Sequence, residues 1–405
     1  MTPALRDWSL LKQPPLRAVF DALDGEGRAT RIVGGAVRDA LLGRDVTDAD
    51  LATVLLPADV IARAEAAGLK TVPTGIEHGT VTVVSGGRPF EVTTLRRDIE
   101  TDGRHAVVRY STDWKEDASR RDFTMNALYC DMQGEVFDPL GGLADLRASR
   151  VRFIGRAEDR IREDYLRILR FFRFFAWYGE GRPDPDGLRA CARLKSGLAT
   201  LSAERVWAEL KRLLKASDPA RALLWMRTTE VLQKVLPESW GIDPIHRVIA
   251  AERIEGWTPD PLFRLEAILP PHRARIDALA ERLRLSRAEA ARLHCWADAP
   301  EADLTISESD LAKRLYRGGR EGIRDRLRHA LAREVEQGHH EAVAALGKQI
   351  AFVELWSPPV FPLSGKDLVA RGIAPGPEVG RRLQELEQRW IESGFSLSRD
   401  ALLGG

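Results

Sequence analysis

Cysteine and long apolar segments are scarce in this sequence. Cysteine occurs at only three of 405 positions, Cys130, Cys191 and Cys295, and this wide spacing argues against a disulfide scaffold and against a zinc ribbon. No apolar run has membrane-spanning length, and the N-terminal stretch lacks the basic-then-apolar pattern of a signal peptide. We therefore expect a cytoplasmic protein without a membrane partner.

The sequence also lacks an excess of charge of either sign. Sixty-one Lys and Arg residues stand against 60 Asp and Glu residues, which gives a formal net charge of +1. This net charge does not by itself indicate a nucleic-acid-binding protein, although a basic face can exist on a protein whose net charge is near zero. Hydrophobic residues make up 44% of the chain and charged residues 30%, as is ordinary for a folded protein.

The hydrophobic pattern of the sequence changes near residue 150. Up to about residue 150, short alternating strands mix with short helices, whereas apolar residues at helical spacing dominate afterwards. The clearest strand pair is GTVTVVSGGRPFEVTTLR, in which Gly86 and Gly87 predict the turn of a hairpin. Residues 97–119 are polar and are expected to form a loop. We predict an α+β fold, with a small mixed sheet and flanking helices followed by an all-α remainder.

The stretch GGAVRDALLGRDVTDADLAT carries the first candidate chemistry. Gly34 and Gly35 close a predicted strand and open a helix, where free N–H groups and the missing Cβ let a phosphate approach. Arg38 lies one turn further and can contact the same anion. Asp48 and Asp50 would share one side of the next strand, and two such carboxylates suit Mg²⁺ bound to substrate phosphates. The alternative is a simple turn followed by a solvated acidic strand end.

Glu91 adds a third acid on the predicted hairpin. Its neighbours Phe90 and Val92 are apolar, so Glu91 points to the opposite face of the strand. A third carboxylate beside two aspartates is what phosphoryl transfer uses to position metals and to deprotonate an attacking hydroxyl. An exposed strand glutamate without a catalytic role is the alternative.

Six motifs follow one another in a fixed order: GGAVRDALLG, the Asp48/Asp50 pair, EVTTLR, RRDFTMNA, FDPLGG and EDYLRILRFFRF. Together they resemble class II tRNA nucleotidyltransferases, the bacterial CCA-adding enzymes and poly(A) polymerases of the polymerase β-like superfamily. The resemblance is dense over residues 30–215 and returns in the C-terminal segment that begins FPLSGKDLVARG. It implies a catalytic head at 1–150, a helical neck with a template helix at 151–216, and a tRNA-binding helical body and tail at 217–405.

The resemblance also implies roles for single residues of the head. Asp48 and Asp50 would bind Mg²⁺, and Glu91 would assist catalysis. Contacts to the incoming nucleotide would come from Gly35, Arg38 and Arg121.

The segment EDYLRILRFFRF carries the chemistry of base choice. Asp164, Arg167, Arg170 and Arg173 recur every third residue, so we expect them on one side of a helix. The resemblance implies that Asp164 and Arg167 form a protein template that accepts C and A while rejecting U and G. Arg170 and Arg173 would serve the triphosphate or hold the template in register. A solvated helix face with a stabilising Asp–Arg pair is the alternative.

The implied activity is the addition of C, C and A to the 3′ end of tRNA from CTP and ATP, without an obligate protein partner. In this family a mobile loop at 97–119 takes part when selection switches from C to A, and its length here favours complete CCA addition. A poly(A) polymerase shares every head motif, but such enzymes often carry a basic tail, and this sequence ends in ALLGG. Two more candidates are an enzyme that adds only CC or only A, and an inactive RNA-binding relative.

Overall fold

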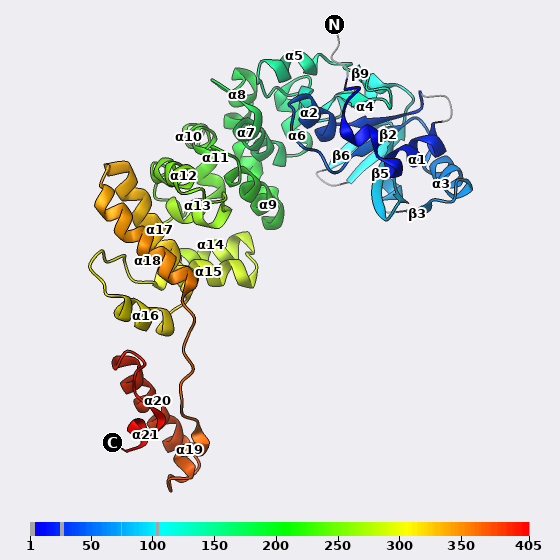
Figure 1. Cartoon of the computed structure of the whole chain (residues 1–405). Helices are drawn as coiled ribbons and strands as arrows, with labels where there is room; N and C mark the ends of the chain where they lie inside the picture. The colour runs from blue at the N-terminus through cyan, green and yellow to red at the C-terminus, as the bar shows by residue number, and fades with distance from the viewer. Residues whose placement is uncertain (1–4, 25–27, 74, 103–104, 405) are drawn as a thin grey trace. The chain divides into compact units, whose positions relative to one another are not determined.

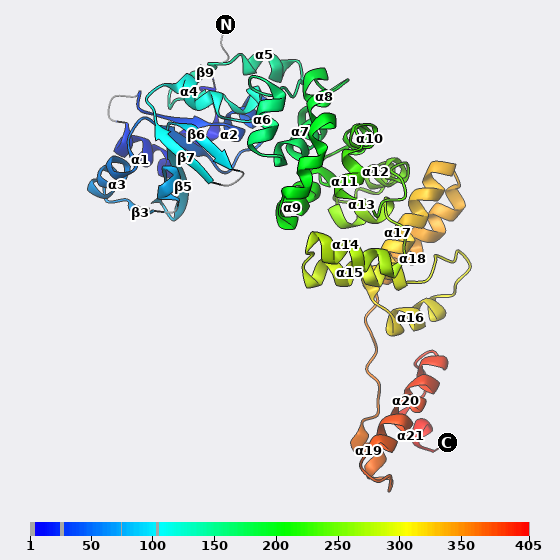
Figure 2. The ribbon, with the colours of Figure 1, turned by 180° about the vertical axis from the view of Figure 1, so that it is seen from behind.

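The computed structural model describes residues 5–24, 28–73, 75–102 and 105–404, and the chain divides into two compact units (Figure 1). The first unit is Met1–Pro237 and the second is Glu238–Gly405. The first unit contains strands and helices up to β9 (Val136–Phe137) and only helices after it, and the second unit is built of helices throughout its described residues (Figure 2). The predicted α+β class, a mixed-sheet head followed by a mostly helical remainder, is confirmed.

One twisted sheet organises the head. Its order is β3-β4-β5-β2-β1-β8-β9, and every neighbouring pair is antiparallel except β2 and β5, which run parallel. The parallel pair makes the sheet mixed, as predicted. The seven strands are β1 (Thr30–Val33), β2 (Asp50–Thr53), β3 (Lys70–Val72), β4 (Thr80–Ser85), β5 (Arg88–Thr94), β8 (Tyr129–Cys130) and β9 (Val136–Phe137).

The predicted hairpin is formed by β4 and β5. Gly86 and Gly87 take φ values of 55° and 75° between these strands, in the left-handed region that a primed hairpin turn requires and that glycine adopts without strain. Phe90 and Val92 are buried on one side of β5, where α1 (Pro14–Leu23) and α3 (Pro57–Ala66) cover the sheet. Glu91 between them is exposed, as the alternation predicts.

The prediction of a loop over residues 97–119 is wrong. The backbone forms a two-stranded sheet of β6 (Arg96–Asp102) and β7 (His105–Tyr110), followed by helix α4 (Trp114–Ser119). The strands were missed because β6 is polar apart from Ile99 and the apolar residues of β7 are consecutive, so neither strand shows an alternating pattern. Asp113 starts α4 by accepting a hydrogen bond from the Lys115 N–H at 2.7 Å, an N-cap within the same polar stretch.

Short helices complete the first unit. Those of the head are η1 (Ser9–Lys12), α2 (Gly35–Leu41), η2 (Ile76–His78), η3 (Thr124–Asn126) and α5 (Gly142–Arg147). The helical part that follows contains α6 (Ala157–Glu163), α7 (Leu166–Tyr178), α8 (Pro185–Leu194), η4 (Lys195–Thr200), α9 (Ala203–Leu214), α10 (Ala220–Thr228) and α11 (Val231–Val235). Four apolar residues of α7 are buried: Leu166, Leu169, Phe172 and Phe175.

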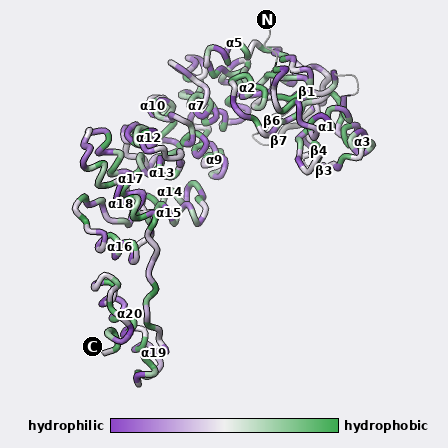
Figure 3. The backbone as a smooth tube through the Cα atoms, viewed as in Figure 1, coloured by the Kyte–Doolittle hydropathy of each residue, from purple (hydrophilic) through white to green (hydrophobic). Residues whose placement is uncertain are grey.

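The second unit is helical throughout its described residues. Its helices are α12 (Pro244–Glu255), α13 (Pro261–Ala267), α14 (Arg273–Leu283), α15 (Arg287–Asp298), α16 (Glu308–Arg317), α17 (Arg320–Gln337), α18 (His340–Leu355), α19 (Gly365–Val369), α20 (Pro377–Glu392) and α21 (Arg399–Leu403). Hydrophobic and hydrophilic residues are interspersed along them (Figure 3). No helix in the described part of the chain combines the length and apolar character needed to cross a bilayer.

Candidate active site

The two glycines of the opening motif lie between two arginines. β1 ends at Val33, Gly34 turns the chain with a φ of 76°, and α2 begins at Gly35. A Cβ at Gly35 would lie 3.4 Å from the Arg38 guanidinium, and one at Gly34 would lie 3.5 Å from Nη1 of Arg121. The missing side chains therefore leave backbone beside two cations, which is the surface an anion needs for close approach.

Arg38 is buried and firmly held. Its Nη1 donates to the side-chain oxygen of Asn126 at 2.5 Å, and its Nη2 donates to the Tyr178 hydroxyl at 2.7 Å. Asp39 accepts from Nε at 3.0 Å and from Nη2 at 2.9 Å. The guanidinium also stacks over the Tyr178 ring, 4.1 Å from its centre. Because most of its N–H groups have partners within the protein, Arg38 presents a fixed charge rather than a mobile one.

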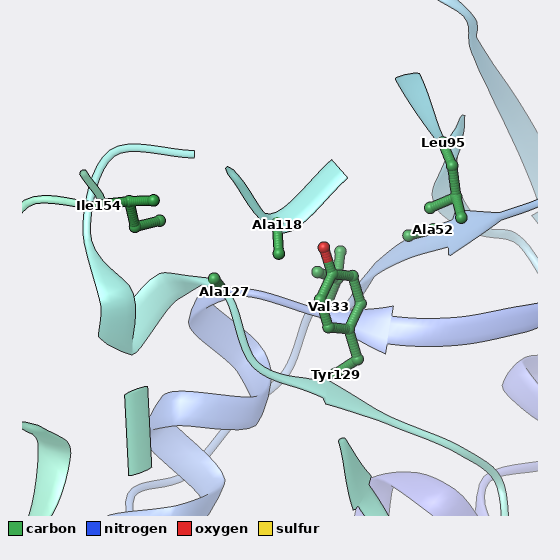
Figure 4. Packing of buried hydrophobic residues seen from close by; sticks show 7 residues of the cluster. All are labelled: Val33, Ala52, Leu95, Ala118, Ala127, Tyr129 and Ile154. Atoms are coloured by element: carbon green, nitrogen blue, oxygen red, sulfur yellow. The ribbon is translucent and has the colours of Figure 1, made fainter. Parts of the chain in front are cut away.

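Arg121 is fixed by Asp117, a buried residue of α4. The Asp117 carboxylate accepts from Nη2 of Arg121 at 3.1 Å, from Nε of Arg120 at 2.8 Å and from the Tyr129 hydroxyl at 2.8 Å. Burial raises the pKa of Asp117, but the two arginines and Tyr129 outweigh burial and hold the pKa below its ordinary value. Tyr129 lies in the apolar cluster between sheet and α4 with its hydroxyl turned toward the segment that carries Ala118 (Figure 4).

The three acids predicted for catalysis lie just before β2, at its first residue and in the middle of its neighbour β5. Asp50 is the first residue of β2, so Asp48 precedes the strand, and both are exposed while Ala49 between them is buried. Leu51 pairs with Val92 in the parallel ladder, which places Glu91 beside Asp50 on the same face of the sheet. The sequence pattern therefore predicted this alignment correctly for Asp50, although Asp48 lies outside the strand.

The pKa of Asp50 is raised, so its ionised form is unfavourable unless a cation lies nearby. Although the side chain contacts solvent, partial burial raises the pKa of Asp50; Arg121 acts in the opposite direction, and the charge of Asp48 adds to the increase. A bound divalent ion would relieve both unfavourable effects, and carboxylate oxygens are the ligands that Mg²⁺ prefers. Within the described part of the chain, no cluster of three His, Cys, Asp or Glu side chains could hold a metal unaided. The pair fits an ion that completes its coordination with water and substrate phosphates.

The predicted template helix is interrupted at Asp164. α6 ends at Glu163 and α7 begins at Leu166, and between them Asp164 has extended backbone with a φ of −157°. Its Oδ1 accepts the Leu166 N–H at 3.1 Å, and its Oδ2 accepts Nη2 of Arg205 at 2.6 Å. The prediction of one continuous helix through Asp164 is therefore wrong, because the backbone of this aspartate is extended and its side chain bonds to the backbone two residues beyond it.

Arg167 lies on the first turn of α7 and is tied back to α6. Its Nη1 donates to the Glu163 carboxylate at 2.5 Å and to the Arg160 carbonyl oxygen at 2.9 Å. Asp164 and Arg167 therefore both belong to the α6–α7 junction, and each has a separate structural partner. Their proximity comes from a bend in the chain and not from one helix face.

The remaining two arginines of α7 have buried acidic partners. Arg170 donates to Asp122, and Arg173 donates through Nε to Glu209 of α9 at 2.6 Å. Burial lowers the pKa of Arg170, but Asp122 outweighs burial and raises it overall. Asp122 also accepts from the Asn126 side chain at 2.9 Å, and this Asn126 binds Arg38. A continuous polar chain thus joins α2 to α7.

A cavity of ≈ 510 Å³ brings most of the predicted residues together. The predicted residues in its lining are Gly35, Arg38, Asp50, Arg121, Asp164, Arg167 and Arg170. Asp48, Glu91 and Arg173 are outside that lining. Larger cavities of ≈ 570 and ≈ 600 Å³ are lined by other segments, so chemistry and not size identifies this one.

The cavity also has lining residues that sequence reasoning missed, notably Arg120, Phe174 and Arg205. Arg205 had one available signal, because it lies four residues before Glu209 on an amphipathic helix and both would share a face. Its partner could not be read from the sequence, since Asp164 is 41 residues away.

Comparison with known proteins gives consistent results. Residues 30–152 match the family described as Poly A polymerase head domain, and residues 182–241 match the probable RNA and SrmB-binding site of polymerase A. CCA tRNA nucleotidyltransferase 1, mitochondrial, of Mus musculus is 36% identical over 96% of this chain and 88% of its own length. A CCA-adding enzyme of Geobacillus stearothermophilus is 39% identical over 60% of this chain and 59% of its own.

Solved structures agree in fold. The crystal structure of the Bacillus stearothermophilus CCA-adding enzyme in complex with CTP has a TM-score of 0.69 and 30% identity, and the alignment covers 94% of each chain. The Thermotoga maritima CCA-adding enzyme complexed with tRNA has a TM-score of 0.62, and its 19% identity supports a shared fold.

Proposed function

Because the chain belongs to the CCA tRNA nucleotidyltransferase family, we propose that it adds C, C and A in turn to the 3′ end of tRNA, using CTP and ATP and releasing pyrophosphate. One observation carries this proposal. A single cavity is lined by the glycine turn with Arg38 and Arg121, by Asp50, and by the Asp164–Arg167 junction. Groups suited to a triphosphate and groups suited to a base thus share one site.

The incoming nucleotide is expected to place its triphosphate beside the glycine turn. Gly34 and Gly35 leave room for phosphate oxygens, and the guanidinium groups of Arg38 and Arg121 lie beside both glycines. Arg38 and Arg121 are each held by carboxylates or amides of the protein, so their charges are positioned before the nucleotide arrives. Arg170, with Asp122, lies in the same lining and would contact sugar or phosphate.

The base is then selected at the α6–α7 junction. An aspartate accepts from an exocyclic amine, and an arginine donates to a ring nitrogen or carbonyl oxygen. Cytosine and adenine both present an amine beside an acceptor ring nitrogen, whereas uracil and guanine present carbonyl and N–H groups there. Asp164 and Arg167 would therefore accept C and A and reject U and G.

Transfer proceeds by in-line attack of the RNA 3′-hydroxyl oxygen on the α-phosphorus. The bond from the α-phosphorus to the bridging oxygen breaks, and pyrophosphate leaves with its electrons. Asp48 and Asp50 would hold Mg²⁺, which neutralises phosphate charge and favours loss of the hydroxyl proton when it is bound. Glu91, beside Asp50 on the sheet, would receive that proton or orient the hydroxyl.

We also propose that three regions of the chain have different functions. The catalytic head would occupy 1–150, the neck 151–216 and the body and tail 217–405, with tRNA on the helical parts. Arg173, held by Glu209, would keep α7 in register and not touch the nucleotide. A cytoplasmic location remains a prediction, and some relatives carry the word mitochondrial in their names.

A primer-extension assay tests the proposal. Purified full-length chain, Mg²⁺ and a tRNA lacking its last three nucleotides would be given CTP, ATP, UTP and GTP singly and together. Two additions that require CTP, followed by one that requires ATP and then a stop, would establish CCA addition. A long ladder with ATP alone would mean a poly(A) polymerase, and a stop after CC, or A-only addition, would mean a partial enzyme. No extension would refute the proposal.

A further inference from the structure

One face of α9 contacts both ends of the segment 164–173, which carries the predicted template residues. Arg205 and Glu209 are four residues apart on this helix and lie on the same side of it. Arg205 donates from Nη2 to Oδ2 of Asp164 at 2.6 Å. Glu209 accepts from Arg173 at 2.6 Å and lies 3.8 Å from Nη1 of Arg170. α9 therefore contacts the segment before α7 as well as α7 itself.

The pair formed by Arg205 and Asp164 differs from an ordinary surface ion pair. The two side chains are 19% and 18% exposed, and both line the nucleotide cavity. Asp164 lies outside both helices, so its backbone lacks the regular ladder that fixes a helical residue. Two hydrogen bonds orient its carboxylate, from the Leu166 N–H to Oδ1 and from Arg205 to Oδ2.

The helix that presents Arg205 is itself well anchored. Val206, Leu210 and Leu213 are buried along α9, which packs against α7. Glu209 is only 3% exposed, and its bonds to the arginines of α7 fix the register between the two helices. Arg205 therefore approaches Asp164 from a rigid support and not from a loop.

We propose that Arg205 is a positioning residue for base selection. It orients the Asp164 carboxylate so that a free lone pair faces the exocyclic amine of cytosine or adenine. This inference rests on the proposed function, and in particular on the template role of Asp164. Without Arg205 the carboxylate loses one of its two anchors, so it can rotate or bind water, and its match to the amine is lost.

The role predicts a selective loss of activity. Uracil has a carbonyl group where cytosine has its amine, so incorporation of UTP does not use the acceptor on Asp164. Arg205→Met should lower kcat/KM for CTP and for ATP about 10- to 100-fold, as expected for loss of one charge-assisted hydrogen bond, while changing kcat/KM for UTP little. The ratio of CTP to UTP incorporation should fall by the same factor. Arg205→Lys should restore part of this ratio, because an ammonium group can donate to Oδ2 but lacks the planar fork.

The experiment compares four forms of the full-length chain: wild type, Arg205→Met, Arg205→Lys and the control Arg189→Met. Arg189 pairs with Asp186 on α8, and their side chains are 69% and 80% exposed, so the control removes an arginine–carboxylate pair outside the nucleotide cavity. Single-nucleotide kinetics with each of the four triphosphates would be combined with calorimetric binding of CTP and UTP without RNA. Thermal melting would identify any variant that fails to fold.

A second comparison isolates the route through Asp164. If Arg205 acts by orienting that carboxylate, Asp164→Ala combined with Arg205→Met should be no more impaired than Asp164→Ala alone. Equal loss for all four nucleotides, or an unchanged CTP to UTP ratio in a folded Arg205→Met, would overturn the inference. Wild-type chain that adds no C or A would instead refute the proposed function, so the two failures are distinguishable.

Discussion

Arg170 donates two hydrogen bonds to one oxygen of Asp122, from Nε at 2.8 Å and from Nη2 at 2.5 Å, although the two residues are 48 positions apart. The aspartate lies in the RRDFTMNA motif and the arginine on α7. Asn126 bridges the other oxygen of Asp122 to Arg38. The segment that would hold the triphosphate is therefore bonded to the helix beside the template.

Asp122→Asn should destabilise the protein in a pH-dependent way. Burial raises the pKa of Asp122, but Arg170, Asn126 and the Phe123 N–H outweigh it and lower the pKa overall. Because the folded-state pKa is depressed, the stabilisation is complete above the ordinary Asp pKa of about 3.9 and is lost as pH falls through the lower folded value. Urea unfolding at neutral pH should show a loss of about 1.5–3 kcal/mol, which is the range for hydrogen bonds to a charged group.

The same variant should approach wild type as pH falls through the lowered pKa of Asp122, because the wild-type carboxylate is then protonated as well. Asp186→Asn provides the control, because its ion pair with Arg189 is exposed and its loss should change the free energy of unfolding by less than about 1 kcal/mol. A difference between Asp122→Asn and wild type that does not shrink on acidification would contradict the charge-pair explanation.

Asp50→Asn should affect activity and stability in opposite directions. Transfer should fall at least about 100-fold, since the amide is a poor ligand for Mg²⁺ and charge on the phosphates is no longer offset. In metal-free buffer at neutral pH the melting temperature should rise, because the raised pKa means that the ionised carboxylate is unfavourable in the folded state. Melting curves with and without Mg²⁺, alongside the transfer assay, test both parts. Near-normal transfer would remove Asp50 from the metal site.

Loss of both template side chains should separate transfer from selection. Asp164→Ala with Arg167→Ala should retain some transfer, because Asp50, Arg38 and Arg121 are unchanged, but lose the preference for C and A. The measurement is the incorporation ratio of CTP to UTP and of ATP to GTP on the same shortened tRNA. Unchanged ratios in a folded double variant would rule out the template role of these two residues.

Glu91→Gln should reduce transfer with little effect on stability. The side chain is exposed at the register position beside Asp50, so its replacement should change the free energy of unfolding by less than about 0.5 kcal/mol. If Glu91 receives or orients the attacking proton, transfer should fall about 100-fold, within the usual contribution of general-base catalysis. Glu77→Gln, an exposed glutamate of η2, is the control. Wild-type turnover in Glu91→Gln would leave the glutamate without a catalytic role.

The sequence predicted features that depend on local pattern. The hairpin around Gly86 and Gly87 and the same-face placement of Asp50 and Glu91 both follow from the alternation of residues along a strand. The interruption at Asp164 could not be predicted in this way. The Asp164 carboxylate bonds to the Leu166 N–H and to Arg205, and Arg205 is 41 residues away in sequence on α9, which packs against α7.

The strands β6 and β7 were not predicted from the sequence for a different reason. β6 is polar apart from Ile99, and in β7 the apolar residues Ala106, Val107 and Val108 are consecutive. Neither strand therefore shows the period-two alternation by which a half-buried strand is identified in a sequence. The glycines, arginines and aspartates of the predicted site could be selected from the sequence because each carries chemical meaning on its own, and most of them line one cavity.

The polar chain from Arg38 through Asn126, Asp122 and Arg170 has a consequence for recombination between relatives. A chimera joined between residues 126 and 170 would take Asp122 from one parent and its arginine from another, together with whatever small shifts each parent has accumulated around them. A junction at the boundary after Pro237 would inherit the whole chain of contacts from one parent. A chimera should therefore acquire the nucleotide preference of one parent when the glycine turn, the RRDFTMNA motif and α7 all come from that parent.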